Sequence, residues 1–207
     1  MSRTRVLLLA LFTLALQAGT AHAHPGHSHG PTENGLVAGL LHPLMGLDHL
    51  LAMVAIGLIA AQLSRPDNPG RQRQAVWLVP GAFLLSMIAG GLVGMNGSML
   101  GGVEYGIAAS IILLGSAIAW NRQAPLVVSL AGAGVFGFFH GHAHGAEMPS
   151  ISQPALYALG FVLTTIGLHL TGVVSGRLAL RTGLGATSLR VSGAAIAVAG
   201  ICLVAFH

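Results

Sequence analysis

The chain has 207 residues, of which 54% are hydrophobic and only 7% are charged, and its formal charge at pH 7 is +4. Soluble domains carry about 25% charged residues, so this composition excludes an ordinary soluble domain and indicates a membrane protein. The charge is too small and too scattered for a nucleic-acid-binding surface, and the single cysteine, Cys202, excludes an intrachain disulfide, a CxxC redox pair and a cysteine-based zinc site.

The first segment, residues 1–23, has the pattern of a secretory signal peptide. Arg3 and Arg5 precede an apolar core, and Ala21-His22-Ala23 fits the A-x-A cleavage pattern. We predict cleavage after Ala23. An uncleaved first helix is the alternative, although the apolar core is short for a membrane span.

Cleavage would leave a His-rich arm, residues 24–35, on the periplasmic side. Its histidines His24, His27 and His29 lie among Pro, Gly and Ser. Short His-rich tracts are typical of metal binding, and we expect weak capture of metal near an entrance. A solvated tail without a role fits the same residues equally well.

Six apolar segments follow and form a predicted transmembrane domain over residues 36–207. Each is about as long as the roughly 20 residues that cross a bilayer, or longer. The connectors between them carry turn and breaker residues, and no sequence repeat or soluble second domain is visible. The expected spans lie near residues 36–63, 75–95, 103–120, 125–146, 154–175 and 188–206.

The arginines after the signal peptide all fall in or beside the first, third and fifth connectors of this layout. The positive-inside rule makes that side cytoplasmic and leaves both termini outside, which agrees with an exported N-terminus. We therefore predict an all-α bundle of six transmembrane helices in the bacterial inner membrane. These arginines are Arg65, Arg71, Arg73, Arg122, Arg177, Arg181 and Arg190.

The fourth predicted span ends in a cluster of metal-ligating residue types. In a continuous helix His140 and His144 are at i, i+4 and Glu147 is at i+7, so the three share one face. Imidazole with carboxylate suits nickel, cobalt or zinc. Gly141 and Gly145 lie on a neighbouring side, where a second helix can approach closely. The plainer interpretation is that these histidines sit at the headgroup level.

The first span contains a second cluster, formed by His42, Asp48 and His49. Pro43 removes a backbone donor and should bend the helix, and a kink between His42 and Asp48 would direct all three side chains toward one centre. Asp48 either binds the ion or orients a ligating histidine. A buried Asp–His pair that holds two helices together is the structural alternative.

Three further residues are weaker candidates for a metal path. Glu104 begins the third span, where it either lines the entrance or caps the helix N-terminus. His169 lies deeper, in the fifth span, and either extends the path inward or packs through a hydrogen bond. His142 lies between the two fourth-span histidines but on another face of the helix.

The two clusters together resemble the signatures of the HupE/UreJ family of hydrogenase and urease accessory permeases. The second signature, Phe-His-Gly-x-Ala-His-Gly-x-Glu, is met at every fixed position from Phe139 to Glu147. The first signature is His-Pro-x-x-Gly-x-Asp-His-x-x-x-Met-x-x-x-Gly, and it is met at His42, Pro43, Gly46, Asp48, His49, Met53 and Gly57.

The resemblance implies a secondary permease for nickel, sometimes cobalt, that feeds nickel enzymes such as hydrogenase or urease. It implies no enzymatic activity and no prosthetic group; the partners are the transported Ni²⁺ or Co²⁺ and the lipid bilayer, and the oligomeric state is open. A metal sensor or store and a haem-binding membrane protein are the alternatives. By motif match the functional positions are His42, Asp48, His49, His140, His144 and Glu147.

Overall fold

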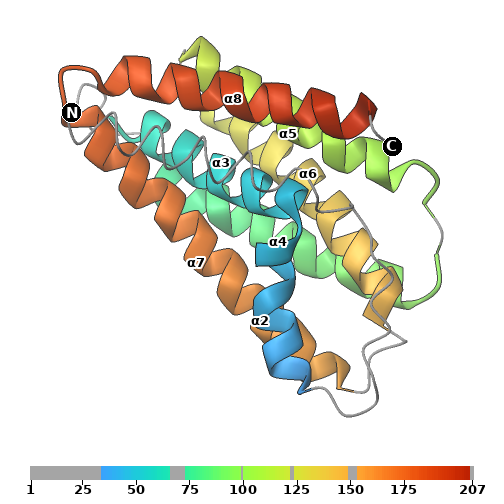
Figure 1. Cartoon of the computed structure of the whole chain (residues 1–207). Helices are drawn as coiled ribbons and strands as arrows, with labels where there is room; N and C mark the ends of the chain where they lie inside the picture. Colours follow the sequence, from blue (N-terminus) through green and yellow to red (C-terminus); the bar gives the residue numbers. More distant parts are fainter. Residues whose placement is uncertain (1–33, 66–72, 99, 122–123, 149–152, 206–207) are drawn as a thin grey trace.

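The computed structural model describes residues 34–65, 73–98, 100–121, 124–148 and 153–205. Within these ranges all regular structure is helical, as predicted (Figure 1). The seven helices are α2 (Gly35–Met45), α3 (Leu47–Leu63), α4 (Ala75–Met95), α5 (Val103–Trp120), α6 (Leu126–Glu147), α7 (Pro154–Leu180) and α8 (Gly185–Ala205). The predicted signal peptide and the predicted His-rich arm up to residue 33 lie outside the described residues.

The predicted kink between His42 and Asp48 is present, but it lies at Gly46 rather than at Pro43, and residues 36–63 do not form one continuous helix. The segment forms two helices, α2 and α3, that meet at 79°. Pro43 is buried inside α2, and the break lies three residues later at Gly46, whose backbone is extended (φ −85°, ψ 115°). The amide of Gly46 still donates to the His42 carbonyl, so α2 closes normally before the chain turns.

Five helices, α4 to α8, are long and apolar enough to cross a membrane, with lengths of 18 to 27 residues. The bent α2–α3 pair passes the same test only when its two helices are counted together. The last two helices also differ slightly from the expected spans, since α7 continues to Leu180 and α8 starts at Gly185.

Helices α4 and α6 pack side by side and run in the same direction, because glycines remove the side chains between them. A Cβ on Gly90 would lie 2.2 Å from the carbonyl oxygen of Phe138, and one on Gly141 would lie 1.8 Å from that of Met87. The predicted close approach of a second helix at Gly141 is thus confirmed, and the helix is α4. This contact holds the His-bearing end of α6 in place.

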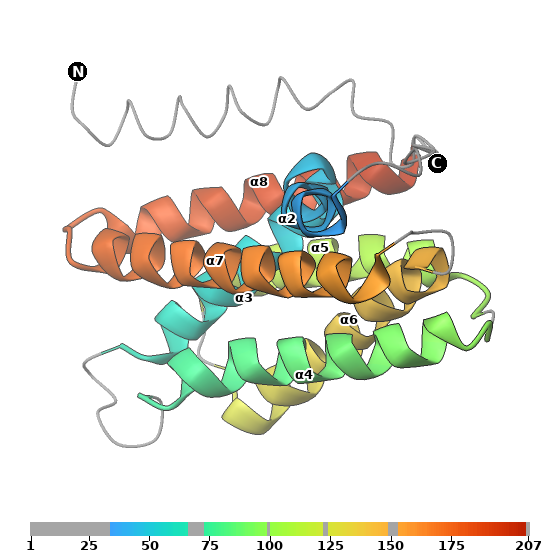
Figure 2. The same cartoon turned by 90° about the horizontal axis from the view of Figure 1, so that it is seen from below.

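Helix α3 lies at the centre of the bundle. It contacts all the other described helices, most extensively α7, and most of its residues after His49 are buried. Figure 2 shows α3 behind α7, with α4 on the opposite side of the bundle from α8. His49, at the start of α3, therefore faces the interior.

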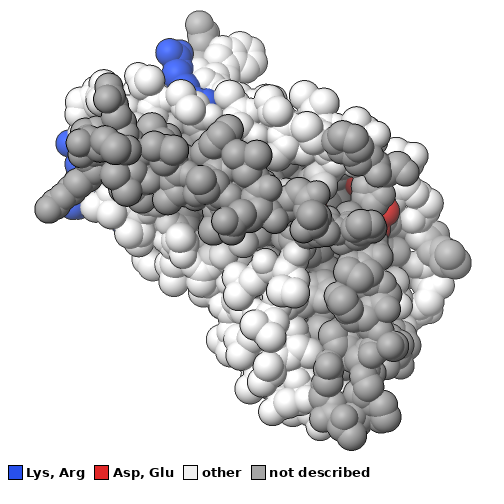
Figure 3. Space-filling view, in the orientation of Figure 1, with Lys and Arg blue, Asp and Glu red and all other residues white. Residues whose placement is uncertain are grey.

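The described arginines lie at one end of the helices. Arg65 follows α3, Arg73 precedes α4, and Arg181 ends α7. On the face drawn in Figure 3 the basic side chains gather near the turn that joins α7 to α8, far from the acidic side chain at the opposite end. At the arginine end Arg65 and Gln62 both donate to the side-chain oxygen of Asn121, which ties α3 to α5. We refer to this end as the arginine end.

Candidate metal centre

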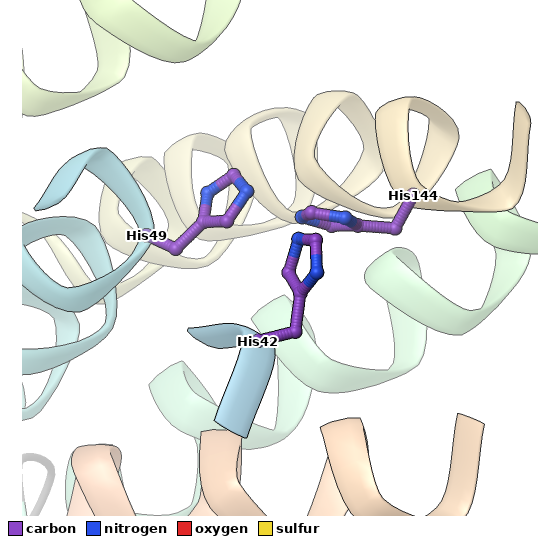
Figure 4. A group of neighbouring side chains, drawn as sticks. All are labelled: His42, His49 and His144. Atoms are coloured by element: carbon purple, nitrogen blue, oxygen red, sulfur yellow. The ribbon is translucent and has the colours of Figure 1, made fainter. Parts of the chain in front are cut away.

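Three histidines from three helices converge inside the bundle. His42 comes from α2, His49 from α3 and His144 from α6, and one ring nitrogen of each lies within 4.8 Å of those of the other two (Figure 4). We call this group the histidine triad. Because the break at Gly46 turns α2 away from α3, two residues from one sequence motif reach the triad from different directions.

The rings are arranged so that His144 lies edge-on to the other two. The His42 and His49 rings are stacked, with centroids 6.1 Å apart and planes inclined by 26°. The His144 ring is 4.6 Å from that of His42 and 4.2 Å from that of His49, nearly perpendicular to both. The nitrogens thus point toward one centre from different sides, as Figure 4 shows.

The spacing of these nitrogens fits a shared metal ion after a small adjustment. Two imidazole nitrogens that bind one ion at about 2.1 Å each can be at most about 4.2 Å apart. The donors of the triad lie within 4.8 Å of one another. Small rotations of the side chains are enough to close the difference.

The triad is buried against aromatic side chains of α7. His49 and His144 are only 3% and 4% exposed. The Phe161 ring lies 4.5 Å from that of His144, and the Tyr157 ring lies 5.7 Å from that of His42. Such an apolar wall excludes water and holds the rings in place, which is how the shell around a metal site controls its polarity.

Asp48 supplies negative charge beside the triad. Its Oδ1 accepts a hydrogen bond of 2.8 Å from the backbone amide of His49 and lies 3.7 Å from the Nδ1 of the same residue. The carboxylate therefore stabilises the start of α3 and faces the His49 ring. This position suits a residue that orients a ligand and offsets the charge of a cation.

His140 extends the cluster beyond the triad. It is fully buried, and its ring is 5.1 Å from that of His49. Its Nδ1 lies 2.8 Å from the carbonyl oxygen of Phe136, and because a carbonyl can only accept, Nδ1 carries the proton. The Nε2 lone pair has no hydrogen-bond partner among the described residues, and a neutral imidazole nitrogen of this kind is a metal ligand.

Of the two glutamates predicted to bind or guide the metal, the structure describes the side chain of Glu104 but not that of Glu147. Glu104 lies in the first turn of α5, where the helix dipole favours a carboxylate. This position agrees with a role at the helix N-terminus, and a role at the entrance stays a prediction. Glu147 is the last residue of α6, but its side chain lies outside the description, as do His24, His27 and His29 of the N-terminal arm.

His142 is directed away from the triad. Its Nε2 donates to the carbonyl oxygen of Ser98, 2.7 Å away in the connector after α4. The side chain is as deeply buried as that of His49, so it links α6 to this connector. His142 thus lies on another face, as the helix geometry predicts.

His169 and the aromatic residues near it complete the surroundings. His169 is buried, and its ring lies against that of Phe83 from α4. The sequence reasoning missed Phe83, Tyr157 and Phe161. The spacing contains a signal for the last two, since Tyr157, Phe161 and His169 repeat at multiples of four and share one face of α7; Phe83 gives no such signal.

Comparison with known proteins identifies relatives over nearly the whole chain. The family described as "HupE / UreJ protein" matches residues 11–203. "Protein HupE" of Rhizobium leguminosarum bv. viciae is 41% identical over 195 residues, which cover 93% of this chain and 94% of that protein. No solved structure matches the chain.

Proposed function

This chain belongs to the HupE/UreJ family, and on that premise we propose that it is a permease for a divalent transition-metal ion, Ni²⁺ or Co²⁺. The ion is the transported substrate, and the protein supplies it to nickel enzymes such as hydrogenase or urease. We assign no catalytic residue and no prosthetic group. The proposed location is the bacterial inner membrane.

The observation that carries the proposal is the histidine triad. Nitrogen donors of His42, His49 and His144 lie within 4.8 Å of one another inside helices apolar enough to cross a membrane. Imidazole nitrogens this close together suit a shared cation, and ionisable groups at membrane depth are expected to be functional.

The acidic residues support a cation as the ligand. Asp48 lies beside His49, and Glu104 lies in the first turn of α5. We infer that these carboxylates offset the charge of the ion where it enters. We also infer that Glu147, which lies at the same end of α6 as His144, contributes to the entrance. The His-rich arm with His24, His27 and His29 would raise the local metal concentration there.

We propose that the α2–α3 pair acts as one broken span, so that the chain crosses the membrane six times. With the arginine end in the cytoplasm and both termini outside, the triad lies nearer to the periplasmic side. An inside-negative potential then favours entry of a divalent ion by roughly 4.6 kcal/mol per 100 mV, at about 2.3 kcal/mol per charge. Release requires that the triad bind weakly enough to let the ion pass on.

The test is uptake of radioactive nickel by metal-starved cells that express the wild-type protein, His144→Ala or His142→Ala. We expect uptake by the wild type and by His142→Ala, and background uptake by His144→Ala at equal protein levels in the membrane. The His142 variant is a matched control because that histidine is equally buried and lies on another face of the same helix.

Competing ions define the substrate. Excess unlabelled cobalt should block uptake and magnesium should not, because imidazole donors suit the former and carboxylate and water ligands the latter. Competition by zinc measures how far the site discriminates among ions that accept the same ligands. Metal binding by the purified protein without any uptake in cells would instead identify a sensor or store and refute the permease.

A further inference from the structure

Two buried histidines lie against the same phenylalanine on the arginine-end side of the triad. The Phe83 ring of α4 is 5.5 Å from that of His140 on α6 and 5.3 Å from that of His169 on α7. Phe83 itself is fully buried. Imidazoles from two helices are therefore placed around one aromatic ring, with His140 next to the triad and His169 farther from it.

His169 has a buried ring nitrogen that is available to bind a metal ion. Its side chain is 3% exposed, and its Nε2 has no hydrogen-bond partner among the residues the structure describes. His140 Nε2 is in the same situation. A buried polar atom without a partner is costly. Two histidines beside the same phenylalanine each have such a nitrogen, and one shared ligand would account for both.

His169 lies closer to the arginine end of the helices than the triad does. It shares a buried face of α7 with Phe161, which contacts the triad, and lies eight residues later, about 12 Å along the helix toward the arginine end. Thr165, between them on this face, is fully buried, and its hydroxyl donates to the Phe161 carbonyl. The face is thus continuous from the triad to His169.

We propose that His169 is a second, inner binding position for the transported ion, which receives it from His140 as the Phe83 ring moves aside. The inference rests on the proposed permease function and adds a step to it. Ligand exchange from one imidazole to another requires no redox change and no covalent step. A divalent transition-metal ion that accepts nitrogen ligands is the chemical class that fits both positions.

A cavity on the arginine-end side of His140 lies between α3, α4, α5 and α6, and none of its lining residues belongs to α7, which carries His169. It has a volume of about 220 Å³ and lies one helical turn beyond the Phe83 and His140 level, since Val79 and Phe136 line it. Gln62, which bonds to Asn121 at the arginine end, lines it as well.

The experiment measures transport and binding separately, with Ni²⁺ and Co²⁺ as probes. Purified full-length wild type, His169→Gln, His169→Asn, His169→Cys and the control His142→Gln are reconstituted into vesicles that contain a metal-sensitive dye. Binding to the same proteins in detergent is measured by calorimetry. Glutamine preserves the size and hydrogen bonding of histidine better than cysteine does, whereas cysteine can ligate the ion.

We expect His169→Gln and His169→Asn to lower the maximal transport rate by about tenfold or more, with affinity at the triad and the half-saturating concentration unchanged. His169→Cys should be faster than both, and His142→Gln should equal the wild type. A packing role for His169 predicts the opposite order, with glutamine better than cysteine. That order, or wild-type rates in all variants, overturns the inner site. Lack of transport by the wild type refutes the permease itself.

Discussion

His42 and His49 face each other across the break at Gly46, with ring centroids 6.1 Å apart and planes within 26° of parallel. In an unbroken helix seven residues would separate their backbones by about 10.5 Å along the axis. The 79° bend between α2 and α3 therefore brings the two imidazoles together. The ring of His144 from α6 lies close to both of them.

We predict that Gly46→Ala weakens metal binding without unfolding the protein. The backbone at Gly46 is in a region that any residue adopts, but a Cβ there would lie 2.8 Å from Asp48 Oδ1 and 3.2 Å from His49 Cδ2. The methyl group should displace the His49 ring from the triad. Nickel affinity of the purified protein is the measurement, and Gly81→Ala, with no neighbour within 4 Å, is the control. Unchanged affinity would show that the triad does not require this space.

Asp48→Asn should lower nickel affinity by about 10- to 100-fold, the range typical of residues that orient a metal ligand. Asparagine keeps an oxygen that accepts the 2.8 Å bond from the His49 amide, so α3 should still begin normally. The lost property is the negative charge 3.7 Å from His49 Nδ1. Calorimetric titration with Ni²⁺ and thermal unfolding of the apo protein separate these effects. A lower melting temperature with unchanged affinity would assign Asp48 to the helix start alone.

Gly141→Ala should destabilise the contact between α4 and α6. The new methyl group would lie 1.8 Å from the Met87 carbonyl oxygen, a backbone atom that no side-chain rotation can move. Overpacking of this kind costs about 1–3 kcal/mol, so we expect a lower melting temperature and less protein in the membrane.

The matched substitution on the same helix is Gly134→Ala, where a methyl group has no neighbour within 4 Å. It should be neutral or stabilise α6 by about 0.5–1 kcal/mol, because alanine has the higher helix propensity. Thermal unfolding in detergent compares the two variants. Equal stability of both would contradict the close packing of α4 against α6.

The proposed orientation predicts which end of the helices is accessible from outside. In a Cys202→Ser background, Thr182→Cys tests the exposed turn between α7 and α8, and His207→Cys tests the C-terminus. In spheroplasts a membrane-impermeant maleimide should label the cysteine at 207 and should reach the cysteine at 182 only after lysis. The reverse pattern would place the arginine end outside and direct the triad toward the cytoplasm.

Much of the architecture was predictable because helices depend on local chemistry. The apolar segments and their breaker residues predict α4, α5 and α6 to within a residue, since backbone hydrogen bonds in a helix connect residues four apart. The same 3.6-residue period correctly separates His142 from His140 and His144. The two motifs indicate the HupE/UreJ family, and the family match over residues 11–203 confirms it.

The sequence by itself determined the helices, the membrane character and the two His-bearing motifs, because each depends on residues close together in the chain. Only the tertiary structure decided that the first segment breaks at Gly46 rather than bending at Pro43, and that His144 joins His42 and His49 while His140 lies against Phe83. Phe161 reaches the triad from a helix more than a hundred residues away from His42. Such contacts arise from the packing of helices on one another, through glycine faces and backbone turns, and no local period encodes them.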